Sequence, residues 1–232
     1  MLSVLLHQQA EAAKERGDTT TAARCDEDRQ DIRVYEELSE MLDNVDAIDV
    51  ATPPVWHGPN AATVLDRGLS VMVEKPMART WWEAAQIAPV VAKAKGVYQH
   101  NENWIYAPTY QLVKGLVDAG DIGRVERVQW FQAHGGPDAF TAFWFCDPQA
   151  AGGGSLTDWG VHAMCSAWYL AGFDKVPFKV RSVGIGVKMR HRILAGRLQC
   201  LKVEDDAVIE VTLQDPITRS ETLLLVEGTW SR

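Results

Sequence analysis

Short apolar runs alternate with amphipathic segments in the first hundred residues. Three runs, at 45–54, 69–76 and 97–101, are mostly apolar and end at prolines or polar residues, which is typical of buried parallel strands. The segments between them, at 58–67 and 81–96, have helical periodicity. Strands that alternate with helices at this spacing predict parallel βαβ units with right-handed crossovers.

The pattern before these units is weaker. Residues 3–16 are predicted to form a helix that stops at Gly17, and the amphipathic segment 35–42 is predicted to form a second, short helix. The β-branched run 19–25 predicts a strand that ends at Asp26.

Beyond residue 104 several strands follow one another with few helices between them. Helices are predicted at 107–118 and 155–171. Strands are predicted at 124–133, 178–188, 205–213 and 220–230. Such an order favours a largely antiparallel sheet. The predicted fold class is therefore α/β, with an incomplete Rossmann-type parallel sheet over 1–103 and an α+β domain with a largely antiparallel sheet over 104–232.

Composition narrows the function classes. The net charge is −8 and the acidic residues are spread along the chain, so binding to a nucleic-acid backbone is not expected. No apolar run reaches the roughly 18–20 residues that a membrane span needs. The four cysteines have no metal-ligand spacing, and the opening residues lack the features of a secretory signal, so we expect a cytoplasmic protein without a metal site.

The first candidate for chemistry is Glu74-Lys75-Pro76, at the carboxyl end of a predicted parallel strand. Ligands of open α/β sheets bind just beyond such strand ends. A lysine there can hydrogen-bond a substrate hydroxyl and favour a developing alkoxide, while the proline fixes the turn that aims it. The alternative is a strand that simply ends in charged surface residues and a proline.

The second candidate is the pair Asp158 and His162, which are four residues apart in a predicted helix and therefore share one face. The histidine could accept a hydroxyl proton while Asp158 holds the ring or the substrate. Two alternatives remain open. Ser155 and Asp158 have the S-x-x-D spacing of a capping box, and His162 could be a packed core residue. A zinc site on the pair is a minor option, because no third ligand stands out.

The third candidate is the segment ATPPVWH at 51–57, just past another predicted strand. Its backbone and the Thr52 hydroxyl could line a dinucleotide groove, or it could be a plain strand-to-helix connection. His134, at the end of the predicted strand 124–133, could also reach a pocket. Several aromatic side chains could stack on a sugar ring or simply fill the core. These are Trp104, Trp130, Phe143, Trp144 and Trp159.

Taken together, the motifs ATPPVWH, VMVEKPMA and GGGSLTDWGVH, in this order and at these separations, resemble the Gfo/Idh/MocA oxidoreductases. The segment GLVDAGDIGRVERVQW fits the same family. This resemblance extends from about residue 19 to residue 232. It implies an NAD(P)-dependent dehydrogenase that moves a hydride between a sugar, inositol or related polyol hydroxyl and nicotinamide.

The resemblance also assigns residues. Lys75, Asp158 and His162 would be catalytic, with His162 as the acid–base residue. The cofactor would be bordered by Asp26, Ala51, Thr52, Pro53, His57, Glu74, Lys75, Pro76 and Asn103. The substrate would contact Lys75, Trp104, His134, Asp158 and His162. An acid at position 26 favours NAD through the ribose 2′-OH, but Arg24 and Arg29 beside it could instead meet the 2′-phosphate of NADP.

One family feature is missing. The sequence has no G-x-G-x-x-G turn, which would let the backbone approach a pyrophosphate at a helix N-terminus. We therefore expect either a chain that is truncated at both ends or a protein that has lost its cofactor-binding loop. In both cases we expect this chain to bind NAD(H) weakly if at all. Two other functions stay open: an NAD-dependent glycosidase of the same fold, and a non-catalytic regulatory or binding protein. The family resemblance also suggests a homo-oligomer.

Overall fold

The computed structural model describes residues 11–30, 32–136, 142–194 and 196–231; the side chains of 28–30, 142, 143 and 194 are not described. The chain divides into two compact units, Met1–Val45 and Asp46–Arg232. No helix among the described residues is both long enough and apolar enough to cross a bilayer.

The first unit is helical. Residues 11–15 are helical, and helices α2 (Thr19–Gln30) and α3 (Leu38–Leu42) follow. The strand predicted at 19–25 is wrong. The Asp18 carboxylate accepts a hydrogen bond from the Thr21 N–H at 3.0 Å, so it caps the helix start. The threonines then occupy the first turn, and the alanines after them favour helix.

Asp26 consequently does not end a strand. It lies within α2, where its carboxylate is 3.2 Å from the Lys14 ammonium. The predicted contact between Asp26 and a cofactor ribose depended on the strand end and loses that basis. Of the predicted helix 3–16, residues 3–10 lie outside the described part of the chain.

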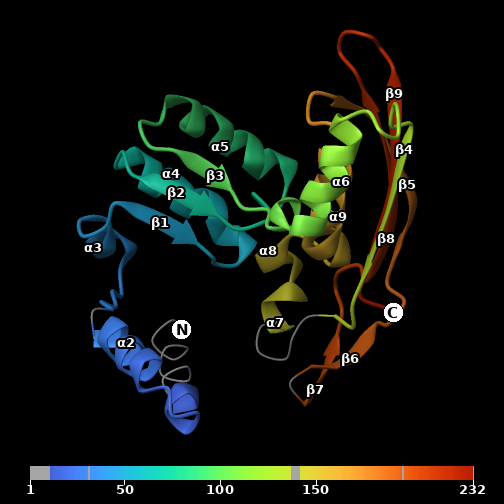
Figure 1. The fold of residues 1–232 in the computed structure, drawn as a ribbon. Helices are drawn as coiled ribbons and strands as arrows, with labels where there is room; N and C mark the ends of the chain where they lie inside the picture. Colours follow the sequence, from blue (N-terminus) through green and yellow to red (C-terminus); the bar gives the residue numbers. More distant parts are fainter. Residues whose placement is uncertain (1–10, 31, 137–141, 195, 232) are drawn as a thin grey trace. The chain divides into compact units, whose positions relative to one another are not determined.

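The second unit begins with a parallel sheet of three strands: β1 (Ala47–Val50), β2 (Ser70–Val73) and β3 (Tyr98–His100). Their order is β1-β2-β3, and both pairs are parallel. Helix α4 (His57–Asp66) connects the first two strands and α5 (Trp81–Lys93) the next two. The two helices pack on each other (Figure 1). The prediction of parallel βαβ units is confirmed.

Burial in this sheet alternates, as a sheet with one covered face requires. Ile48 and Val50 of β1 and Val71 and Val73 of β2 are buried, whereas the residues between them are more exposed. The carboxyl ends of β1 and β2 lie side by side, since Val50 pairs with Val73. The loops after these two strands therefore share one edge of the sheet.

The second sheet has the strand order β4-β9-β8-β5. Its strands are β4 (Arg127–Ala133), β5 (Val176–Gly186), β8 (Asp206–Gln214) and β9 (Glu221–Thr229). The pairs β5–β8 and β8–β9 are antiparallel, while β4 and β9 are parallel. The prediction of a largely antiparallel sheet is confirmed, with one parallel pair at the β4 edge.

Helix α9 (Val161–Ala171) lies against this sheet, and helix α6 (Pro108–Asp118) packs on α9 (Figure 1). The core between α9 and the strands is made of small residues on the helix and branched residues on the strands. These are Ala163, Ala167, Ala171, Val211, Leu213, Leu224 and Val226. The alanines let the helix approach the sheet closely.

Short elements complete the unit. The one-turn helices are η1 (Pro54–Trp56), η2 (Trp104–Tyr106), α7 (Ala142–Phe145) and α8 (Pro148–Ala151), and the hairpin strands are β6 (His191–Leu194) and β7 (Arg197–Cys200). A π-helix, η3 (Leu156–Gly160), precedes α9. Because α8 contacts η1, and η3 contacts β9, the two sheets are joined at the edge where β1 and β2 end.

Candidate active site

Lys75 and Asp158 meet across the two sheets. Lys75 follows β2, and Asp158 lies in the π-helix η3. The Lys75 Nζ is 2.8 Å from Asp158 Oδ1 and 3.0 Å from the Asp158 carbonyl oxygen. Both side chains are largely buried, with 17% and 11% exposed. The Lys75 side chain therefore does not point into solvent. This argues against the alternative in which the strand simply ends in charged surface residues.

The capping-box alternative for Asp158 is wrong. The Ser155 hydroxyl is buried and has no hydrogen-bond partner among the described residues. Glu204 caps the helix instead, because its Oε1 accepts from the N–H groups of Gly154 (2.9 Å) and Leu156 (3.0 Å). Only glycine fits at 154, since a Cβ there would lie 1.8 Å from the Glu204 carbonyl oxygen. Asp158 is thus left available for Lys75.

Asp158 is held on its other oxygen as well. The indole N–H of Trp230, just after β9, donates to Asp158 Oδ2 at 3.1 Å. Trp230 is fully buried. Trp230 is not predicted from the sequence as a site residue, because a tryptophan at a strand end carries no signal of the helix that it will face.

His134 lies beside the same carboxylate, with its Nε2 3.5 Å from Asp158 Oδ2. Burial lowers the pKa of His134, and the nearby Asp158 opposes that shift only in part. A histidine with a pKa below its usual 6.5 is neutral at pH 7. His134 thus lies as a neutral ring next to Asp158, but it lines neither of the cavities that border Lys75, and its contact with a substrate stays a prediction.

His162 has a different partner from the one expected. Its Nδ1 is 2.7 Å and 2.8 Å from the two carboxylate oxygens of Glu102, which lies just beyond β3. The i, i+4 spacing brings Asp158 and His162 to the same region, but Asp158 bonds Lys75 and Trp230 rather than the imidazole. Sequence reasoning missed Glu102, although it follows a parallel strand as Lys75 does, a position that could have pointed to it.

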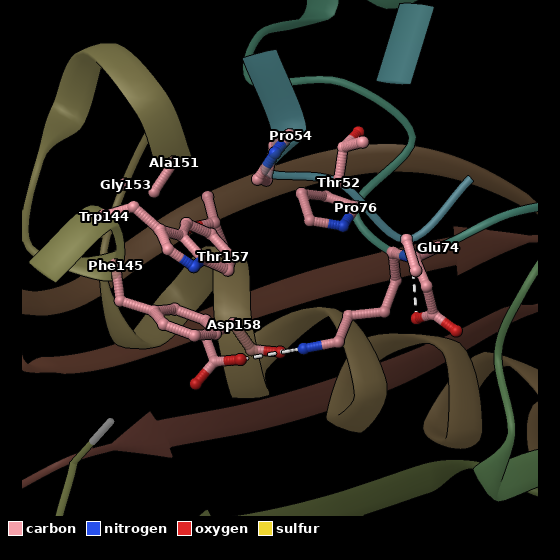
Figure 2. A pocket seen from close by; sticks show the side chains of 12 residues that line it. Thr52, Pro54, Glu74, Pro76, Trp144, Phe145, Ala151, Gly153, Thr157 and Asp158 are labelled. Carbon is pink, nitrogen blue, oxygen red and sulfur yellow. Dashed lines mark hydrogen bonds and ion pairs between the residues drawn. The ribbon is translucent and has the colours of Figure 1, made fainter. Parts of the chain in front are cut away.

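Two cavities border Lys75. The first, of about 160 Å³, is lined by Ala51, Thr52, Pro54, Glu74, Lys75, Pro76, Trp144, Phe145, Ala151, Gly153, Thr157 and Asp158. Figure 2 shows Trp144, Phe145 and Thr157 on one side and Thr52, Pro76 and Glu74 on the other. The second, of about 290 Å³, is lined by Glu74, Lys75, Asn101, Asn103, Trp104, Trp159 and His162.

The volumes of the two cavities limit the size of the ligand that each could hold. Pockets for whole small ligands usually measure roughly 300–1,000 Å³. The first cavity is smaller than that and suits one ring of a larger ligand. The second is near the lower limit and suits a single sugar-sized ring. Lys75 and Glu74 line both.

His57 supports the loops around the first cavity instead of lining it. Its Nδ1 is 2.7 Å from the Pro76 carbonyl oxygen and its Nε2 is 2.7 Å from the Thr52 carbonyl oxygen. The side chain is buried, so it ties the loop after β1 to the loop after β2. Pro53 precedes η1 and does not line either cavity, unlike Ala51, Thr52 and Pro76.

The aromatic candidates separate into three groups. Trp144 is stacked on Phe145, with ring centroids 3.8 Å apart, and both line the first cavity. Trp104 and Trp159 meet edge to face in the wall of the second. Trp130 packs against Tyr110 and the core under α9, so it is a core residue. The side chain of Phe143 lies outside the described part of the structure.

Sequence comparison places this site in a known family. Residues 3–102 match the profile described as the oxidoreductase family with an NAD-binding Rossmann fold, and residues 110–218 match the GFO/IDH/MocA C-terminal domain. The chain belongs to the GFO/IDH/MocA family. The resemblance seen in the three motifs is thereby confirmed, as is the fold class.

Two relatives of this GFO/IDH/MocA chain are named for different compounds, rhizopine and levoglucosan. It is 30% identical over 165 residues to the rhizopine catabolism protein MocA of Rhizobium meliloti, covering 70% of this chain and 50% of that protein. It is also 29% identical over 131 residues to the levoglucosan dehydrogenase of Pseudarthrobacter phenanthrenivorans. That match covers 56% of this chain and 34% of the dehydrogenase. The chain thus spans about half the length, or less, of these relatives.

Solved structures agree on the fold. The structure of GenD2 from gentamicin A biosynthesis, in complex with NAD, matches this chain with a TM-score of 0.71 and 30% sequence identity. The match covers 95% of this chain and 57% of the GenD2 chain. The structure of levoglucosan dehydrogenase with NADH and L-sorbose matches with a TM-score of 0.75, over 91% of this chain and 55% of the dehydrogenase chain. At 22% sequence identity this match shows the fold alone.

The first cavity fits the nicotinamide end of the dinucleotide that this family binds. Thr52 lines this cavity, and its hydroxyl is buried without a hydrogen-bond partner in the described structure. Ala51, Thr52, Lys75 and Pro76 would hold the ring. The described part of the chain contains no cluster of three or more His, Cys, Asp or Glu side chains that could hold a metal ion.

Proposed function

We propose that the protein catalyses NAD(P)-dependent oxidation of a secondary hydroxyl on a sugar, inositol or related polyol, and the reverse reduction. The observation that carries this is the position of Lys75 between two cavities, one lined by Thr52 and the other by His162. A hydride transfer needs such an arrangement, because the donor carbon and the acceptor ring must lie in contact.

Each residue then has a role. His162 lines the second cavity and would take the hydroxyl proton of a sugar bound there. Lys75 would donate a hydrogen bond to the same oxygen as negative charge develops on it. Asp158 orients the Lys75 ammonium, since it accepts from it at 2.8 Å. A bound nicotinamide supplies the hydride acceptor.

The substrate ring would rest between the aromatic side chains of the second cavity. Trp104 and Trp159 offer apolar faces, while Asn101, Asn103 and Glu74 offer polar groups for hydroxyls. We also propose the boundary between a dinucleotide-binding domain and a substrate domain at 103/104. The two family profiles match on either side of it, although both sheets belong to one compact unit of the structure.

The test is turnover of the protein expressed from its natural gene, with NAD⁺ or NADP⁺ and a panel of neutral sugars, inositols and polyols. NADH or NADPH formation at 340 nm with at least one substrate is expected. Release of nitrophenol from a nitrophenyl glycoside without net NADH formation would instead identify a glycosidase. If no panel member is turned over although the cofactor binds, the dehydrogenase proposal fails.

We further propose that copies of this chain pair through the second sheet. Phe178, Val180 and Ile185 of β5 are more than half exposed, which is costly for large apolar side chains that meet only water. A dimer or higher oligomer is expected by light scattering. A strictly monomeric protein at micromolar concentration would contradict this.

A further inference from the structure

The Glu102–His162 pair is buried and short. Glu102 is 7% exposed and His162 is 9% exposed, and both carboxylate oxygens lie within 2.8 Å of Nδ1. Glu102 is itself fixed, because its Oε1 accepts from the Trp104 N–H at 3.0 Å. It lies two residues beyond the end of β3, next to Asn101, whose N–H donates to the Val73 carbonyl oxygen of β2 at 2.8 Å.

The charge of this carboxylate is set by its partners. Burial by itself raises the pKa of Glu102, but hydrogen bonds from His162 and the Trp104 N–H outweigh that effect, so the pKa is lowered overall. Glu102 is therefore ionised at neutral pH and can only accept hydrogen bonds. The imidazole nitrogen that faces it must carry a proton.

We infer that Glu102 is the positioning residue for His162: it fixes the tautomer with the proton on Nδ1 and leaves Nε2 with the lone pair that accepts the substrate proton. When Nε2 takes that proton the ring becomes an imidazolium, and the adjacent carboxylate stabilises the new charge. In the reverse direction the same pair returns the proton to the carbonyl oxygen.

The contacts of Asp158 make this assignment necessary. An aspartate four residues before a histidine is the obvious partner for the ring, but both of its oxygens already have other partners. Lys75 occupies Oδ1, and Trp230 occupies Oδ2. The site therefore has two separate polar pairs: Asp158 orients the ammonium, and Glu102 orients the imidazole.

The inference rests on the proposed function, so its test has one readout that needs no turnover. In protein with ¹⁵N-labelled histidine, the His162 ring should show a downfield Nδ1–H proton that is hydrogen-bonded to Glu102. In Glu102→Gln that downfield proton resonance should be lost or moved upfield, because the neutral amide accepts a weaker hydrogen bond. An unprotonated Nδ1 in the unmodified protein would overturn the inference, whether or not activity is found.

Kinetics supply the second readout. Glu102→Gln should lower kcat by about 10–100-fold, a part of the 10²–10⁴-fold that a positioned base contributes, while the sugar KM and the NADH Kd change less than threefold. Glu102→Asp should recover part of the loss. Glu210→Gln removes a carboxylate paired with Arg181 away from both cavities and should leave kcat unchanged. An unchanged kcat in Glu102→Gln, with the unmodified protein active, overturns the inference but not the proposed function.

Discussion

Replacing His162 with alanine is expected to lower kcat by about 10²–10⁴-fold in the protein expressed from its gene, because the only imidazole that lines the second described cavity is then lost. Lys75→Ala should lower kcat by a similar factor, since it removes the donor that stabilises the developing alkoxide. Steady-state assays with the best substrate from the panel, together with NADH titration by calorimetry, measure both effects.

The loss of activity in these two variants should be distinguishable from the effect of a folding defect. NADH affinity is expected to stay within about tenfold, because each change deletes a group at the reacting centre and leaves the loop after β1 intact. His191→Ala is the matched control: it removes a histidine from β6, on the separate two-stranded hairpin, and should leave kcat unchanged. Full activity in both His162→Ala and Lys75→Ala would remove the dehydrogenase assignment of this site.

The second large effect is on stability, at the buried Asp205. This carboxylate is completely buried and accepts from the N–H groups of Lys188 (2.6 Å) and Met189 (2.8 Å) and from the Arg192 guanidinium (3.3 Å). Asp205→Ala leaves the buried Arg192 guanidinium without its counter-ion and the N–H groups of Lys188 and Met189 without their acceptor. We expect the free energy of unfolding to fall by about 3–5 kcal/mol, measured by urea denaturation.

Asp205 also connects stability to the site. Its carbonyl oxygen accepts from the Trp230 N–H at 2.7 Å, and Arg192 donates to the Trp230 carbonyl oxygen at 2.6 Å. The same cluster thus fixes the indole that holds Asp158. Asp118→Asn, which breaks the exposed pair with Lys114 on α6, is the control and should cost less than about 1 kcal/mol. A loss in Asp205→Ala no larger than in this control would show that the buried cluster is not structurally important.

The parallel half of the fold could be predicted because its signals are local. Apolar runs closed by Pro53 and Pro76 mark strand ends, and strand ends of a parallel sheet share one edge. The local prediction that failed is the strand at 19–25, which has β-branched residues but no apolar run. The hydrogen bond from the Thr21 N–H to the Asp18 carboxylate caps a helix there instead. Propensity alone is a weak predictor of secondary structure.

The sequence by itself determined the family, the two kinds of sheet, and the placing of Lys75 at a strand end and of Asp158 and His162 on one helix face. Only the tertiary structure decided their partners. Glu102 lies 60 residues from His162, and Trp230 lies 72 residues from Asp158. Glu204 lies 50 and 48 residues from the two N–H groups that it binds, those of Gly154 and Leu156. A hydrogen bond between residues so far apart depends on how the two sheets join, and no short sequence pattern records that geometry.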